Sequence, residues 1–128
     1  MLDHISLTAS DVARARAFYD KALAPLGIDV VMEVPAELTG GQAYLGYGSE
    51  GRPYFWVSGG ERLTGALHVA FSAKDRASVD AFYAAAIAAG GADNGGPGVR
   101  AHYHPNYYGA FVMDPDGHNI EAVCHLPA

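Results

Sequence analysis

Two histidines and a glutamate have a spacing that suits metal chemistry. His4 opens the stretch HISLT, and His68 opens the similar stretch HVAFS 64 residues later. Glu121 follows His68 by 53 residues, beyond the turn-like segment DPDG. Two imidazoles and one carboxylate suit Fe²⁺, Mn²⁺, Zn²⁺, Co²⁺ or Ni²⁺. We therefore predict one divalent metal ion on these three side chains, with open positions for substrate, water or dioxygen.

The 53-residue interval from His68 to Glu121 can also be counted from His4, the equivalent histidine of the first half. Fifty-three residues after His4 lies Val57, an apolar residue, where the second half has Glu121. The sequence thus predicts a pseudo-symmetric site of His4, His68, Glu121 and Val57.

Further histidines follow Val99. His102, His104 and Arg100 are expected on one face of a strand, and either histidine is a candidate for proton transfer because imidazole titrates near neutral pH. The alternative is a solvated edge strand. His118, just after the turn, is expected to face solvent, and His125 is expected to be incidental.

Aromatic residues offer a wall for an organic substrate. Tyr54 and Trp56 alternate with Phe55, so one side of this strand is expected to line a cavity, although ordinary core packing is the alternative. We predict substrate-binding roles for Tyr54, Trp56, Arg100 and Tyr108. Cys124 is interpreted as a small buried hydrophobe.

The elements that position these residues come from an internal repeat. With an offset of 64 and no gap, several residues of the first half match the second. The matches are Asp11 with Asp75, Phe18-Tyr19 with Phe82-Tyr83, Ala22 with Ala86 and Gly27 with Gly91. Each copy opens with an alternating strand, followed by a helix for which Ser10 or Asp11, and Asp75, are the expected N-caps.

Three strand-like runs follow each helix. They cover about residues 28–34, 42–47 and 54–57 in the first copy, and 99–104, 107–113 and 119–124 in the second. We predict an α+β fold of two tandem βαβββ modules that form a curved, half-open mixed barrel with both histidines inside. The chain is read as one domain, with module one at about 1–58, a linker at 59–65 and module two at about 66–126. Loops at 35–41 and 90–98 are expected at the cavity rim.

Composition excludes several classes of protein. Eight Lys and Arg against 14 Asp and Glu give a formal charge of -6, which argues against a nucleic-acid or anionic-membrane surface. No apolar run approaches the roughly 20 residues that span a bilayer, and an acid stands where a signal peptide has a base. One cysteine excludes an internal disulfide, so a cytoplasmic location is the default expectation.

The sequence resembles the vicinal oxygen chelate superfamily, which includes glyoxalase I, extradiol dioxygenases, fosfomycin-resistance transferases and bleomycin-binding proteins. The resemblance rests on DHISL with AFY at 17–19, on HVAF at 68–71, and above all on FVMDPDGHNIE at 111–121. It implies paired βαβββ modules, a divalent metal and a substrate that chelates through adjacent oxygens. The family's metal positions match His4, His68 and Glu121.

Departures from the family patterns argue against some of the family's activities. Glyoxalase I has a fourth ligand, a glutamate, where this chain has YFWV at 54–57, which argues against lactoylglutathione lyase activity. Extradiol dioxygenases share the two-histidine, one-glutamate set and a further histidine that His102 or His104 would supply, but Phe111 replaces their tyrosine. Fosfomycin-type enzymes need a basic clamp, for which only Arg100 and Lys74 are available.

Two functions remain open at this point. The first is a metal-dependent dioxygenase, or a lyase or isomerase, acting on a small molecule with vicinal oxygens. The second is a non-catalytic protein that sequesters a planar small molecule, as bleomycin-resistance proteins do. The resemblance also implies a homodimer. If the two chains exchange modules, His4 would meet His68 and Glu121 of the other chain, and the sequence leaves exchanged and unexchanged pairing open.

Overall fold

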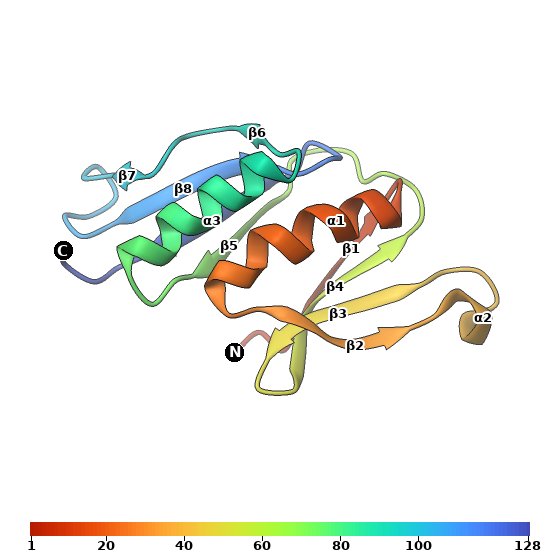
Figure 1. The fold of residues 1–128 in the computed structure, drawn as a ribbon. Coiled ribbons are helices and arrows are strands. Elements are labelled where there is room, and N and C mark those ends of the chain that lie inside the picture. The colour runs from red at the N-terminus through yellow and green to blue at the C-terminus, as the bar shows by residue number, and fades with distance from the viewer.

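The computed structural model describes residues 1–128 and has two sheets, with two long helices packed against one face of them (Figure 1). The first half contains β1 (Ile5–Ala9), α1 (Val12–Leu23), the 3₁₀ turn η1 (Ala24–Leu26), β2 (Asp29–Val34), α2 (Ala36–Thr39), β3 (Tyr44–Ser49) and β4 (Arg52–Gly59). The second contains β5 (His68–Ser72), α3 (Arg76–Ala88), β6 (Ala92–Asp93), β7 (Gly98–Val99), β8 (Tyr108–Met113) and β9 (Asn119–Cys124).

The two sheets have the same connectivity. The first sheet has the order β1-β4-β3-β2, and the second has β5-β9-β8-β6 with β7 also paired to β8. In each, the opening strand lies parallel to the last strand of its half, and the other neighbours are antiparallel. The predicted α+β class with two sheets is confirmed. The sheets do not close into a barrel.

Both long helices begin at the expected aspartates. The side chain of Asp11 accepts a hydrogen bond from the Arg14 N–H at 3.1 Å, and Asp75 accepts one from the Ser78 N–H at 2.7 Å. Each carboxylate satisfies an N–H of the first turn that has no partner within the helix. Of the two candidates for the first cap, Asp11 is the one used.

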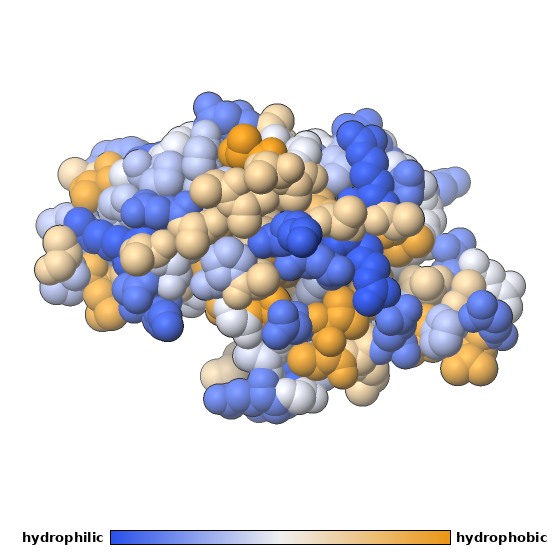
Figure 2. Space-filling model, viewed as in Figure 1, coloured by the Kyte–Doolittle hydropathy of each residue, from blue (hydrophilic) through white to orange (hydrophobic).

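The core lies between the helices and one face of each sheet. Helices α1 and α3 run side by side across this face (Figure 1), and Figure 2 shows moderately hydrophobic surface over them in the same view. Phe55 of the first sheet contacts Phe71 of the second at 5.2 Å between ring centroids. Because the helices cover only one side, each sheet keeps a second face turned away from them, which we call its open face.

Two expectations are wrong in the second half. The expected strand over 99–104 is only β7, followed by turns in which the Tyr103 N–H donates to the Arg100 carbonyl. Arg100, His102 and His104 therefore do not share a strand face. His118, expected in solvent, is 3% exposed, and its Nε2 has no hydrogen-bond partner.

The turn that carries His118 is bonded to the first half of the chain. Asp116, in the same turn, accepts hydrogen bonds from the Ser10 N–H at 2.9 Å and the Ser10 hydroxyl at 2.5 Å. The Tyr19 hydroxyl donates to Asp114 at 2.5 Å, and the Arg62 Nε–H donates to the Asp116 carbonyl. These bonds hold the β8–β9 turn against the start of α1.

None of the helices is long and apolar enough to span a bilayer.

Candidate metal and substrate site

His68 and Glu121 meet on the open face of the second sheet. The parallel register of β5 and β9 places Glu121 opposite Ala70, two residues beyond His68. His68 Nε2 lies 2.7 Å from Glu121 Oε1. The His68 side chain is 50% exposed, whereas that of Glu121 is 1% exposed. Burying a carboxylate costs free energy unless it is paired, and the accessible His68 imidazole supplies one of its partners.

The second oxygen of Glu121 is also bonded. The Tyr107 hydroxyl donates to Glu121 Oε2, and burial together with this bond raises the pKa of Tyr107 above its usual range. Gly109 makes room for the contact: a Cβ there would lie 3.2 Å from the Tyr107 ring and 3.3 Å from the carboxylate oxygen. Glycine at this position lets the tyrosine reach the glutamate.

Phe111 and Arg100 extend this surface. Phe111 pairs with Glu121 across β8 and β9, and its ring centroid lies 6.1 Å from that of His68. The guanidinium carbon of Arg100 lies over the Phe111 ring, 5.4 Å from its centroid. Arg100 also donates through Nη2 to the Gly96 carbonyl at 2.7 Å.

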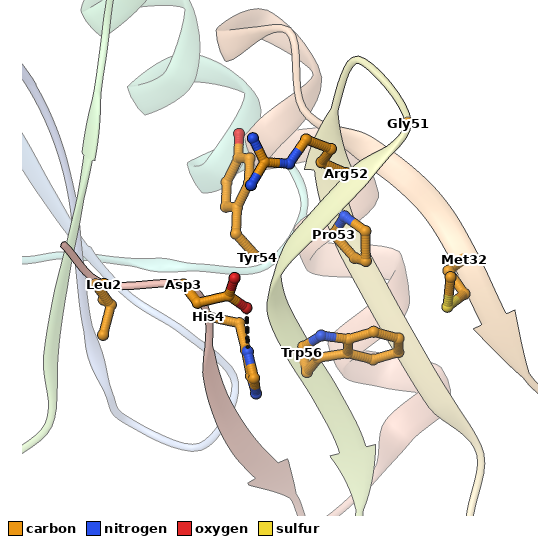
Figure 3. Close-up of a pocket in the computed structure, with 9 residues that line it drawn as sticks. All are labelled: Leu2, Asp3, His4, Met32, Gly51, Arg52, Pro53, Tyr54 and Trp56. Carbon is orange, nitrogen blue, oxygen red and sulfur yellow. Dashed lines mark hydrogen bonds and ion pairs between the residues drawn. The ribbon is translucent and has the colours of Figure 1, made fainter.

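His4 lies on the other sheet. It borders a pocket of about 690 Å³, which is also lined by Leu2, Asp3, Met32, Gly51, Arg52, Pro53, Tyr54 and Trp56 (Figure 3). His4 Nδ1 lies 2.7 Å from an Asp3 carboxylate oxygen, and this hydrogen bond lowers the pKa of Asp3. The His4 side chain is 55% exposed.

The first sheet has Trp56, not Val57, at the place of Glu121. Ser6 of β1 pairs with Trp56, as the equivalent Ala70 of β5 pairs with Glu121. Val57 is 0% exposed and belongs to the core. The expectation for Val57 is wrong because the chain from β1 to β4 is one residue shorter than the chain from β5 to β9, so counting residues moved the position to the other face of the strand.

One chain brings together two of the three predicted ligands. His68 and Glu121 are in contact, and no group of three His, Cys, Asp or Glu side chains in the chain is arranged to hold a metal ion. The imidazole and buried carboxylate fit two positions of a divalent metal site. His4 shows the same kind of accessible donor on the open face of the other sheet.

His104 and His125 form a pair that the sequence reading did not identify. His104 Nε2 lies 2.7 Å from His125 Nδ1, and the Asn106 N–H donates to His104 Nδ1. Because His104 Nδ1 accepts this bond, Nε2 is the nitrogen that donates the hydrogen bond to His125. The His104 ring packs against Tyr107 at 5.5 Å between centroids, whereas His102 contacts Tyr103.

The predicted substrate-binding residues fall in different places. Tyr54 and Trp56 line the pocket beside His4, and Arg100 lies near Phe111 on the second sheet. Tyr108 points toward the helices, because its hydroxyl donates to Asp80 of α3 at 2.6 Å. Tyr107 was expected only as part of an aromatic cluster with Tyr103, Tyr108 and Phe111, although its alternation with Gly109 and Phe111 places it on the face of Glu121.

The fold agrees with comparisons to known proteins. A family model described as the Glyoxalase/Bleomycin resistance protein/Dioxygenase superfamily matches residues 1–122. The chain belongs to this superfamily. The resemblance seen in the sequence is thereby confirmed. None of the curated proteins compared with the chain matches it.

Solved structures show the same fold. A glyoxalase/bleomycin resistance protein from Albidiferax ferrireducens is 28% identical, with a TM-score of 0.73 over 96% of this chain and 97% of that one. A glyoxalase/dioxygenase from Nostoc punctiforme is 25% identical, with a TM-score of 0.67 over 98% and 91%. A mutant of maize glyoxalase I is 22% identical, with a TM-score of 0.70, and this chain spans 45% of its length.

Proposed function

We propose that this protein is a metal-dependent enzyme of the glyoxalase/dioxygenase type. Its substrate would be a small molecule that chelates a divalent ion through neighbouring oxygens. The observation that carries the proposal is the buried Glu121 carboxylate in contact with the accessible His68 imidazole. Glu121 and His68 would hold the ion, together with His4.

The third ligand would come from a second copy of the chain. His4 is accessible on the open face of the first sheet, and His68 is accessible on the open face of the second. In a dimer that places these two faces opposite one another, His4 of one chain approaches His68 and Glu121 of the other. The pairing is symmetric, so each dimer would contain two such sites.

The surrounding residues would bind substrate and exclude water. When bound, a divalent ion supplies a Lewis acid that polarises substrate oxygens. Tyr107 fixes the orientation of the Glu121 carboxylate, and Phe111 covers one side of His68. Trp56 and Tyr54 offer flat apolar surface for the organic part of the substrate.

Proton transfer is assigned to the loop that precedes β8. Of the two predicted candidates, His104 is favoured because it packs on Tyr107, which itself contacts Glu121. Trp56 at the place of Glu121 leaves the first sheet without a carboxylate ligand there. The resulting three-ligand set favours dioxygen insertion over lyase or isomerase chemistry.

Metal analysis tests this proposal. The protein, expressed with Fe²⁺ or Mn²⁺ supplementation, is expected to contain close to one ion per chain. H68A and E121Q should each lower metal affinity by more than about 100-fold, the upper limit for a residue that merely touches a ligand. The control H102A should retain the ion. Full metal uptake by E121Q would contradict the assignment.

A second function is favoured by the pocket beside His4. Trp56 lines this pocket, and its indole passes so close to Gly46 that an added Cβ there would lie 2.8 Å from the ring. A protein that only sequesters a planar molecule would use this surface without metal. Less than about 0.2 equivalents of metal after supplementation, together with quenching of Trp56 fluorescence by a planar ligand, would favour that function.

A further inference from the structure

We propose that Arg100 binds a carboxylate of the substrate, so that the substrate class is a carboxylated molecule with vicinal oxygens. This inference rests on the function proposed for His68 and Glu121. It adds a second site of substrate recognition, a cation for a carboxylate, which the metal ligands do not define.

Arg100 is held in place by its surroundings. Its guanidinium lies over the Phe111 ring, and Nη2 donates to the Gly96 carbonyl. A Cβ at Gly95 would come within 3.3 Å of Nη2, and one at Gly98 within 3.1 Å of Nη1. Two glycines and an aromatic ring thus shape a slot for this side chain, whose conformational freedom is already reduced before a ligand binds.

The charge of Arg100 has no acidic partner. The four ion pairs of the chain involve Arg16, His4 and His68, and none includes Arg100. Only one of its N–H groups is bonded in the structure, whereas guanidinium has five donors in a planar fork. That fork matches the two oxygens of a carboxylate.

Arg100 lies on the same side of the second sheet as the proposed metal ligands. Phe111 contacts both, since the guanidinium covers its ring and His68 lies 6.1 Å from its centroid. A single small molecule can therefore reach both points. In a chain of net charge -6, a fixed and unpaired cation at this position selects an anionic ligand.

Two probes of the same shape test the proposal. Calorimetry on the Mn²⁺-loaded protein compares 3,4-dihydroxybenzoate with the uncharged 3,4-dihydroxybenzamide. We expect the carboxylate to bind at least about tenfold more tightly, which corresponds to about 1.4 kcal/mol. R100Q should abolish this preference and R100K should reduce it. R14Q, which removes an exposed arginine of α1, should preserve it.

The failures of the two proposals are distinguishable. Metal content is measured separately, and benzoate and benzamide are compared on metal-free protein by NMR shift changes. Normal metal uptake with equal affinity for the charged and uncharged probes would overturn the role of Arg100 alone. A preference for benzoate that depends on Arg100 would support the carboxylate site even if metal uptake failed. Circular dichroism confirms that each variant is folded, and an unchanged preference in R100K and R100Q would overturn the inference.

Discussion

The open faces of the two sheets share a framework but present different chemistry. His4 and His68 occupy equivalent positions, yet the residue beside them is Trp56 in the first sheet and Glu121 in the second. The indole borders an open pocket, whereas the carboxylate is buried and bonded on both oxygens. One half is thus suited to stacking on an organic molecule, and the other to holding a cation.

This difference shows how two copies of one structural unit can present different binding surfaces. Both halves use the same order of main strands and one long helix, and the residues that differ here lie on the faces turned away from the helices. The side chains near that position also differ: Met32 and Tyr44 line pockets with Trp56 in the first sheet, whereas Tyr107 and Phe111 lie beside Glu121 in the second.

The largest expected effect is a difference in stability between variants of two neighbouring residues of β4. Phe55 is 1% exposed and contacts Phe71 of the other sheet, whereas Trp56 faces the pocket. F55A should lower the free energy of unfolding by about 3–5 kcal/mol because it leaves a cavity in the core. W56A should cost much less and instead weaken binding of a planar ligand. Urea denaturation followed by circular dichroism measures both, and equal destabilisation by the two variants would contradict the assignment of faces.

A smaller effect is expected from the tyrosine that contacts Glu121. Y107F removes the hydroxyl but keeps the ring, so the carboxylate loses a donor that fixes its orientation. Metal affinity should fall by about 10- to 100-fold. Y103F, in the same loop, is the matched control. Competition with a metal-sensitive chelating dye gives both affinities, and an unchanged value for Y107F would remove this tyrosine from the site.

The smallest effect concerns the contact between the halves. Burial would raise the pKa of Asp116, but the two hydrogen bonds from Ser10 outweigh it and lower the pKa below its usual value. The carboxylate therefore contributes stability above its unfolded pKa, and this contribution is lost as the pH falls through its lower folded pKa. S10A should cost about 0.5–1 kcal/mol at pH 7, since the pair is partly exposed.

The pH dependence of S10A provides its own control. The difference in unfolding free energy between wild type and S10A should shrink as the pH falls below 4, because protonated Asp116 no longer favours the bond. Thermal melts between pH 2.5 and 7 measure this difference. A difference that is the same at both ends would mean that the hydroxyl acts independently of the Asp116 charge.

Much of the fold could be predicted from the repeat. The matching strands at His4 and His68, the caps at Asp11 and Asp75, and the α+β class follow from alternation, helical spacing and capping chemistry. These features depend on residues close together in the chain, which is why the sequence alone predicts them.

The errors arose where distant contacts decide the outcome. Residues 99–104 alternate as a strand does, but a turn closes at Arg100 and Tyr103. His118 is buried, and its turn is bonded to Ser10 of the other half, a contact that spacing along the chain does not predict. Val57 was expected at the place that Trp56 occupies, because a difference of one residue in chain length moves a side chain to the other face of a strand. Tyr107 could have been found from its alternation with Phe111, whereas the pairing of His104 with His125 required the structure.

The central claim is that His4 of one chain completes the site formed by His68 and Glu121 of another. A hybrid dimer of H4A with E121Q, purified through two different affinity tags, tests this most directly. Neither variant alone should hold the ion, but the hybrid contains one intact set of ligands if the site is shared between chains. The account predicts about one metal ion per hybrid dimer, measured by mass spectrometry of the metal content. A hybrid as free of metal as its two parents would contradict it.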